Sequence, residues 1–234
     1  MDESQYNPYG YTEEQLWCLG LSAINAQGNG ERHDILTHSD PERFRNTLSA
    51  WWDIDDRKSY LESVQWLRGG GHRQGFNEIV GQVEARTSVE LRALMEEIGK
   101  KDPRLSHQYR IVNHYRTVMS GCGIAAWDLA RVVLLARMGC TCGYIDEAEA
   151  WKTIFNEAHQ ANSLFRNWYS FAHSYLIGRQ FAMRNLNDEA GVENIKSTHL
   201  LLTNPTSPWL RYPDFGSYEL GALTSSQSTP EKLH

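Results

Sequence analysis

The sequence predicts an all-α protein, because of where its prolines lie, how its helix starts are capped and how its apolar residues are spaced. No proline occurs between Pro103 and Pro205, a span long enough for several uninterrupted helices. Asp40-Pro41 and Asp102-Pro103 each place a capping carboxylate directly before a proline suited to the first position of a helix. Strand signals are sparse, since no Asn-Gly or Asp-Gly turn separates alternating runs of β-branched residues.

Apolar residues that recur every three or four positions mark the helices in order along the chain. We expect helices at 13–27, 41–51, 55–67, 74–85, 88–98, 104–119, 123–139, 146–163 and 168–184, with a weaker one near 188–202. Asp146, with Glu149 three residues later, resembles a capping box at the start of its helix. The hydrophobic content of 41% suffices for one large core, so we expect a single globular domain of nine or ten helices over residues 1–203.

The composition changes after Thr203, where three prolines precede a stretch rich in Ser and Thr. Such a segment lacks the apolar periodicity of a helix. We therefore expect an extended, partly disordered C-terminal arm over residues 204–234. Its large aromatic residues, Trp209 and Phe215, are the expected anchors of this arm.

The helix at 123–139 is apolar on nearly every face, which is typical of a helix at the centre of a globular protein. Asp128 and Arg131 lie three residues apart within its apolar arc, and charged groups in such a place need partners. Arg179 likewise lies on an apolar helix face, one turn from Tyr175. The simplest interpretation is an inter-helix ion pair or triad of Asp128, Arg131 and Arg179 that fixes how the helices at 123–139 and 168–184 dock.

Charge and composition argue against several classes of function. The net charge is −6 and the isoelectric point is near 5.8, with no basic cluster, so neither nucleic acid nor an anionic membrane is an expected partner. The acidic, polar N-terminus does not resemble a secretory signal, and no run of eighteen apolar residues occurs. We therefore expect a cytoplasmic protein.

The cysteines and histidines do not predict a metal site or a cofactor. Four cysteines are too few for a disulfide framework, and Cys140-Thr141-Cys142 is too short for a zinc knuckle, so we expect free thiols. Gly69-Gly70-Gly71-His72 lacks the Gly-Lys-Ser/Thr of a phosphate loop and any preceding strand. It predicts a flexible turn between helices in which His72 caps neighbouring carbonyls.

Several short motifs taken together resemble the landmarks of a bacterial family, the YbeU/YbeR type with domain of unknown function 1266. The motifs are Trp52-Asp53-Ile54 with Arg57, Gly71-His72, Ala126-Trp127-Asp128-Leu129-Ala130-Arg131, Gly143-Tyr144-Ile145 with Trp151, and Tyr175-Leu176-Ile177-Gly178-Arg179-Gln180-Phe181. The resemblance spans about residues 50–182. In one departure, Ala182 stands where the family tends to have a second aromatic residue, so a smaller contact is expected there. The resemblance implies a helical bacterial protein with no assigned activity.

Two classes of function stay open at this point. Acidic charge, high aromatic content and the absence of a catalytic spacing favour a protein-interaction or regulatory module, including the immunity type that neutralises another protein. The aromatic residues that could anchor another protein, if they are exposed, are Trp51, Trp52, Trp66 and Trp209.

The alternative is an enzyme or a small-anion-binding protein. Its pocket would be formed by Asp128, Arg131, Tyr175 and Arg179, with His72 as a group that transfers protons. A concave site open to solvent would favour this alternative, whereas complete burial of the four residues would favour the interaction module. The oligomeric state stays open in both cases.

Overall fold

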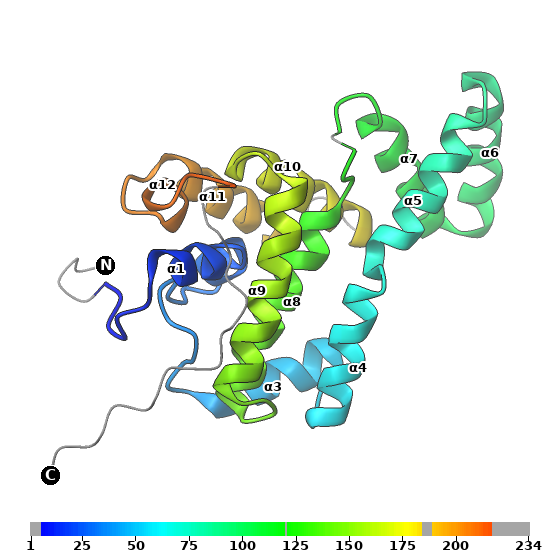
Figure 1. The fold of residues 1–234 in the computed structure, drawn as a ribbon. Coiled ribbons are helices and arrows are strands. Elements are labelled where there is room, and N and C mark those ends of the chain that lie inside the picture. Colours follow the sequence, from blue (N-terminus) through cyan, green and yellow to red (C-terminus); the bar gives the residue numbers. More distant parts are fainter. Residues whose placement is uncertain (1–5, 120, 184–188, 217–234) are drawn as a thin grey trace, which may run out of the picture.

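The computed structural model describes residues 6–119, 121–183 and 189–216, and every regular element in these ranges is a helix (Figure 1). The helices are α1 (Glu13–Gly20), α2 (Ala23–Gly28), α3 (Pro41–Trp52), α4 (Arg57–Arg68), α5 (Gly71–Glu84), α6 (Ser88–Lys101), α7 (Pro103–Tyr115), α8 (Ala125–Cys142), α9 (Glu147–Leu164), α10 (Trp168–Ala182), α11 (Glu189–Thr203) and α12 (Pro208–Arg211). The all-α prediction is confirmed. The helix expected at 13–27 is instead two helices, because the backbone departs from helical angles at Ser22 (φ −95°, ψ 7°).

The capping residues read from the sequence begin the helices as expected. The side chain of Asp40 accepts a hydrogen bond from the backbone N–H of Arg43 at the start of α3, and Asp102 begins α7 in the same way. Asp146 and Glu149 accept hydrogen bonds from each other's backbone N–H groups, at 2.8 and 3.1 Å. These bonds satisfy N–H groups that would otherwise have no partner in the first turn.

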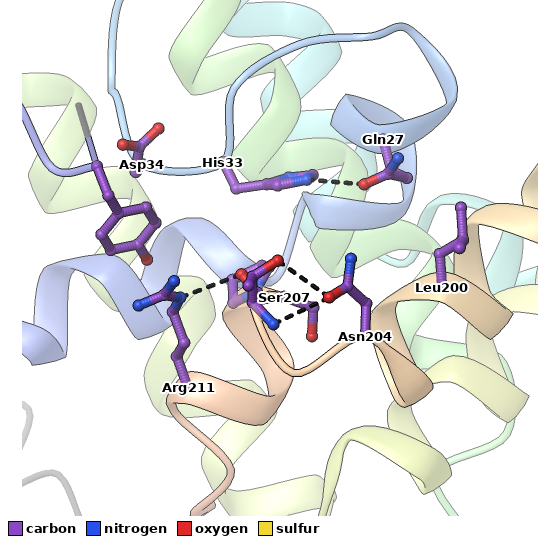
Figure 2. A pocket seen from close by; sticks show the side chains of 10 residues that line it. Gln27, His33, Asp34, Leu200, Asn204, Ser207 and Arg211 are labelled. Atoms are coloured by element: carbon purple, nitrogen blue, oxygen red, sulfur yellow. Dashed lines mark hydrogen bonds between the residues drawn. The ribbon is translucent and has the colours of Figure 1, made fainter. Parts of the chain in front are cut away.

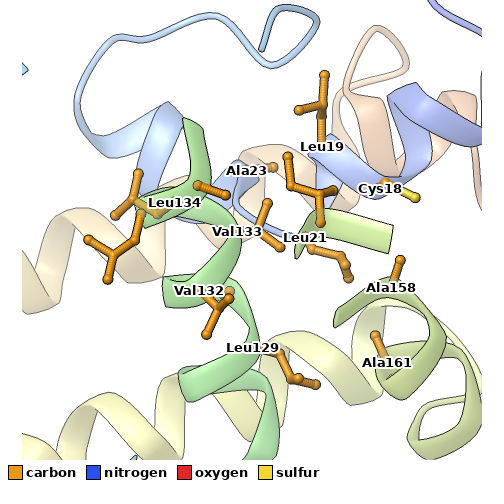
Figure 3. Packing of buried hydrophobic residues seen from close by; sticks show 14 of the residues in the cluster. Cys18, Leu19, Leu21, Ala23, Leu129, Val132, Val133, Leu134, Ala158 and Ala161 are labelled. Carbon is orange, nitrogen blue, oxygen red and sulfur yellow. The ribbon is translucent and has the colours of Figure 1, made fainter. Parts of the chain in front are cut away.

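Helix α8 is the centre of the main hydrophobic core. From Ala125 to Gly139 every residue is buried, because α8 packs against α3, α4, α9 and α10. Figure 3 shows Leu129, Val132, Val133 and Leu134 of α8 in one cluster with residues of α1, α2 and the link between them, and with alanines of α9. The prediction that the helix at 123–139 lies at the centre is confirmed.

A second, smaller hydrophobic cluster lies where α5, α6 and α7 pack together beside α10 (Figure 1). Its members are Phe76, Ile79, Val83, Leu91, Tyr109, Ile111, Val112, Ile124, Ile177 and Phe181. Ile177 and Phe181 of α10 belong to this cluster while Tyr175 of the same helix belongs to the main core, so α10 connects the two. The single domain over 1–203 stays a prediction.

The predicted arm contains a short helix within residues 204–216. Trp209 of α12 is only 1% exposed; its ring stacks on Trp168 at 5.0 Å, and its indole N–H donates to the carbonyl of Gly20 at 2.8 Å. Phe215 contacts the rings of Trp17 and Trp168. The expected anchoring by Trp209 and Phe215 is confirmed, and the rest of the arm, 217–234, lies outside the described residues.

Two glycines allow helices to approach α8 closely. At Gly178 of α10 an added Cβ atom would overlap the Cβ atom of Trp127. At Gly139 of α8 an added Cβ would lie 2.6 Å from the ring of Tyr60 on α4.

Among the described residues, we find no helix that is both long enough and apolar enough to span a bilayer.

We expect Gly178→Ala to destabilise the protein by about 1–3 kcal/mol, because the methyl group forces α10 away from Trp127. Urea unfolding followed by circular dichroism measures this change. Gly81→Ala is the matched control: it lies within α5, and an added Cβ there meets nothing within 4 Å. The control should gain up to about 1 kcal/mol from the better helix propensity of alanine. Equal stability of Gly178→Ala and the natural protein would contradict the close packing of α8 and α10.

Candidate functional site

The carboxylate of Asp128 caps a helix that lies far away in the sequence. Its oxygens lie 3.3 Å from the backbone nitrogen of His72 and 3.1 Å from that of Arg73, both in the first turn of α5. Gly70, at the N-cap position of α5, makes no side-chain capping bond. Asp128 of α8 therefore takes the place of the missing cap, and its negative charge lies where the helix dipole favours it.

Gly71 makes room for this contact. Its φ of +47° lies in the left-handed region, and an added Cβ would lie 2.8 Å from the Asp128 carboxylate. The predicted turn between helices is present, since α4 ends at Arg68 and α5 begins at Gly71. The prediction that His72 caps carbonyls is wrong: its backbone N–H donates to Asp128, and its imidazole faces Arg131.

Three basic side chains surround the Asp128 carboxylate, which is only 1% exposed. Arg73 Nε lies 3.3 Å, Arg131 Nη1 3.5 Å and His72 Nδ1 3.8 Å from its oxygens. Arg131 Nη1 also lies 2.9 Å from His72 Nδ1. Because a guanidinium can only donate, Nδ1 accepts this bond and His72 carries its proton on Nε2. Asp128 and Arg131 are paired, but both belong to α8, so this pair does not join two helices; the pair with Arg73 joins α8 to α5.

The guanidinium of Arg131 lies among three indole rings, which we call the tryptophan cluster. Its central carbon lies 4.5 Å from the ring centre of Trp52, 4.8 Å from that of Trp127 and 5.7 Å from that of Trp66. Cation–π attraction is strongest at tryptophan and increases where water is excluded. Burial lowers the pKa of Arg131 to about 10, although the charge of Asp128 opposes this. The arginine is thus held by charge on one side and by aromatic faces on the others.

Tyr175 and Arg179 lie inside the protein. The ring of Tyr175 packs edge-on against Trp127 at 5.1 Å, and its hydroxyl donates to Asn194 Oδ1 of α11 at 3.2 Å. Burial raises the pKa of Tyr175, and the positive charges of Arg131 and Arg179 act in the opposite direction. Arg131 is paired with Asp128, and Arg179 is buried on α10.

The four residues of the pocket alternative, Asp128, Arg131, Tyr175 and Arg179, are each more than nine-tenths buried. His72 is more accessible and lines a hollow of about 400 Å³ together with Gly71 and Gly75 of α5 and Gln108 of α7. None of the four buried residues lines that hollow. Their burial favours a structural role for them.

The four tryptophans considered as anchors for a partner differ widely in exposure. Trp51 is 82% and Trp66 49% exposed, whereas Trp52 is partly buried beside Arg131. Trp209 is excluded as an exposed anchor, because α12 folds it against Trp168 and the carbonyl of Gly20. The exposed set is therefore reduced to Trp51 and Trp66.

Sequence reasoning missed a third buried charge on α8, that of Arg137. Its Nη1 donates to the hydroxyl of Ser22, and its Nη2 donates to the carbonyls of Arg32 and Ile35, at 2.6 to 3.1 Å. These contacts hold the segment 29–40, which connects α2 to α3 without a helix. The signal was present, since Arg137 lies on the same all-round apolar helix as Asp128.

Titratable side chains of the segment 29–40 face Arg137. Burial, reinforced by the charge of Arg137, lowers the pKa of both His33 and His38 to about 4. Burial raises the pKa of Glu31, against the attraction of Arg137. Both histidines are therefore neutral at pH 7.

The remaining candidates are the side chains that could bind a metal ion and the four cysteines. In the described residues, no three His, Cys, Asp or Glu side chains lie close enough to hold a metal ion. The four cysteines form no disulfide, and burial raises the pKa of the Cys140 thiol to about 11. A thiol of this kind is a poor nucleophile at neutral pH.

Two of the motifs behind the family resemblance meet in space. Arg57 at the start of α4 pairs with Glu149 through two hydrogen bonds of 2.5 and 2.9 Å, and also donates to the carbonyl of Tyr144 at 2.9 Å. The Trp52-to-Arg57 motif is thereby joined to the Gly143-Tyr144-Ile145 motif. Ala182 is buried, as a small residue in a tight contact would be.

Comparison with known proteins agrees with that resemblance. The model of the family described as "Protein of unknown function (DUF1266)" matches residues 47–213. "Uncharacterized protein YbeR" of Escherichia coli (strain K12) is 26% identical over 153 residues, which cover 63% of either protein. "Uncharacterized protein YbeU" of the same organism is 24% identical over 173 residues, 72% of either protein. The match to YbeR thus spans less than two thirds of that protein. No solved structure matches the chain.

We expect Asp128→Ala to cost on the order of 3–5 kcal/mol of unfolding free energy, because two basic side chains and two helix N–H groups lose their buried partner. Gly71→Ala should also destabilise, by about 1–3 kcal/mol, through its contact with the carboxylate. In the double variant this contact is gone, so its cost should be smaller than the sum of the single costs by about 1 kcal/mol or more. Urea titration of all three variants measures the difference. Glu96→Ala, at an exposed position of α6, serves as control, and additive costs would contradict the direct contact.

We expect acid to weaken the segment 29–40. The pKa of His33 and of His38 falls from 6.5 in the unfolded chain to about 4 in the folded protein, so unfolding takes up protons between these values. Stability is therefore lost as pH falls from 6.5 toward 4. The raised pKa of Glu31 acts in the opposite direction, so variants are needed to separate the two effects.

Urea midpoints between pH 7.5 and 4.5 measure this effect. The His33→Gln/His38→Gln variant should show a flatter pH profile than the natural protein. His199→Gln, at an exposed position of α11, should keep the natural profile. Identical slopes for the double variant and the natural protein would refute the assignment.

Proposed function

The chain belongs to the family of proteins of unknown function DUF1266, and we propose that this member is a protein-interaction module that binds its partner through Trp51 and Trp66. The observation that carries the proposal is the exposure of these two indole rings, 82% and 49%. Tryptophan is the residue type most enriched among the side chains that dominate binding energy in protein interfaces. A large ring left in water gains most when a partner covers it.

The protein holds Trp66 in place before any partner arrives. Its ring packs edge-on against His72 at 5.2 Å, and His72 accepts a hydrogen bond from Arg131. Arg131 in turn is fixed by Asp128 and by the tryptophan cluster. A side chain that is already ordered loses little conformational entropy on binding, which favours affinity.

Trp51 lies beside Trp52 at the end of α3, where polar side chains surround it. A shallow hollow next to Trp51 is lined by Asp40, Glu42, Arg43, Asn46 and Thr47. Interfaces commonly place a few aromatic anchors inside a polar rim that carries charges of both signs. The surface of α3 has this composition.

A regulatory protein of the immunity type needs only such a surface, because it acts by covering its target rather than by chemistry. The burial of Asp128, Arg131, Tyr175 and Arg179 supports this proposal over an enzyme that uses those four residues. In this proposal the buried charges of Asp128 and Arg131 have a structural role, which is to hold the ring of Trp66 in position at the binding surface.

We expect Trp51→Ser and Trp66→Ser to weaken binding of the partner protein by at least about 30-fold each, the size of an interface hot spot. Affinity capture from native cytosol with the natural protein identifies the partner, and calorimetry with the purified partner measures the dissociation constant. Trp51→Ser should leave the thermal midpoint nearly unchanged, because its ring is almost fully exposed.

Tyr169→Ser is the matched control, since this aromatic residue of α10 is 72% exposed and should not affect binding. Equal affinity of the tryptophan variants and the natural protein would refute the proposed surface. Light scattering tests whether the surface instead binds a second copy of this chain. A dimer of the natural protein that becomes a monomer in Trp51→Ser would refute the proposal that the partner is a different protein.

A further inference from the structure

The C-terminal end of α3 carries negative charge next to an exposed tryptophan. Trp51 lies in the last turn of α3, and Asp53, the residue at the C-cap, follows two positions later. Asp55 comes two positions after Asp53, and all three residues are exposed. Because two residues of extended chain span about 7 Å at most, the backbone of Asp53 lies close to that of Trp51.

The backbone of α3 adds to this negative charge. The last carbonyl groups of a helix carry a partial negative charge, which a basic side chain in the last turn commonly stabilises. The last turn of α3 contains no basic residue. Among the residues that the structure describes, no basic side chain forms an ion pair with Asp53 or Asp55. A positive charge at this end of α3 would therefore be stabilised by both the helix and the two carboxylates.

The basic side chains nearby in the sequence are engaged with other groups. Arg57 pairs with Glu149, and Lys58 Nζ lies 3.9 Å from the carboxylate of Glu62. Arg45 of α3 donates to the backbone carbonyl of the last residue of α8 at 3.1 Å. These three cations therefore do not balance the charge at the end of α3.

The hollow beside Trp51 also has an excess of negative charge. Asp40 and Glu42 bring carboxylates to its lining, and Arg43 brings the guanidinium. That guanidinium lies 3.8 Å from the carboxylate of Glu31, which is buried. Along α3, Trp51 is thus followed by the carboxylates of the C-terminal end and is preceded by those of the hollow.

The cavity drawn in Figure 2, of about 210 Å³, provides a contrast, because two of its amide side chains are engaged within the protein. Figure 2 shows the contact of 3.0 Å between Nε2 of His33 and the side-chain oxygen of Gln27. The side-chain oxygen of Asn204 accepts hydrogen bonds from the backbone N–H and the hydroxyl of Thr206, each 3.0 Å long. Polar groups of that cavity satisfy one another, whereas the carboxylates at the end of α3 face the solvent.

We infer that the partner covers Trp51 with a basic segment, whose lysine or arginine side chains lie near Asp53, Asp55 and Glu42. This inference rests on the proposed function, since it specifies the partner of the same surface. The face of an exposed indole ring attracts a guanidinium or ammonium group, and the carboxylates attract it as well. Complementary charge also speeds the encounter of two proteins and disfavours partners of the wrong sign.

Two capped peptides, hexaarginine and hexaglutamate, test the inference at constant ionic strength. The indole N–H signals of isotope-labelled protein report binding by nuclear magnetic resonance, and the signal that is missing in Trp51→Ser belongs to Trp51. The expected result is a saturable shift of this signal with hexaarginine and none with hexaglutamate. An unchanged Trp51 signal with hexaarginine, or an equal shift with both peptides, overturns the inference.

The double variant Asp53→Asn/Asp55→Asn shows which charges attract the peptide. Asparagine preserves the size of the side chain and tolerates the left-handed φ of +52° at position 53. The affinity for hexaarginine should fall about three- to tenfold, as expected for the loss of two exposed charge pairs. Glu84→Gln/Glu96→Gln, at exposed positions of α5 and α6, changes the net charge equally and should have little effect. Equal losses in both double variants would show attraction by the net charge alone and overturn the inference.

Calorimetry with the captured partner distinguishes this inference from the proposed function. The inference predicts that Asp53→Asn/Asp55→Asn weakens the complex and reduces the dependence of its affinity on salt. If Trp51→Ser weakens the complex and the double variant does not, the proposed function stands and the basic segment is refuted. If Trp51→Ser leaves the affinity unchanged, the proposed function itself fails.

Discussion

The structure depends on one constraint: α8 is buried on all sides and yet carries the charges of Asp128, Arg131 and Arg137. A buried charge without a partner costs several kcal/mol, more than most single interactions contribute. Each charge therefore has to recruit a partner from another part of the chain. Asp128 accepts hydrogen bonds from the first turn of α5, Arg131 lies against indole rings, and Arg137 donates hydrogen bonds to carbonyls of the segment 29–40.

Arg137 and Arg131 of α8 meet this requirement in different ways. Arg137 is surrounded by backbone carbonyls and a serine hydroxyl, and its environment is closed. Around Arg131 the partners are side chains, and one of them, Trp66, extends to the solvent. The buried charge of Arg137 is thus satisfied entirely inside the protein, whereas the partners of Arg131 include the partly exposed ring of Trp66.

The sequence predicts the parts of this arrangement that local chemistry decides. Asp40, Asp102 and Asp146 begin helices because a capping side chain acts within three residues, and the all-round apolar pattern places α8 at the centre. The backbone N–H groups that Asp128 caps lie 55 and 56 residues away in the sequence, and no local pattern indicates such a contact. The groups that accept hydrogen bonds from Arg137 include backbone carbonyls, which every sequence provides. Nothing local distinguishes Trp209 from Trp51 either, because exposure is decided by how α12 packs.

The capping of α5 by Asp128 has a consequence for the order in which the protein can form during synthesis. A ribosome delivers the chain from its N-terminus, so the first turn of α5 exists long before the carboxylate that completes it. The segment 29–40 is synthesised earlier still, and its hydrogen bonds with Arg137 can form only after more than a hundred further residues have been added. The N-terminal third of the nascent chain therefore remains unfinished until α8 has been translated, and α8 acts as the step at which earlier segments become committed to their native positions.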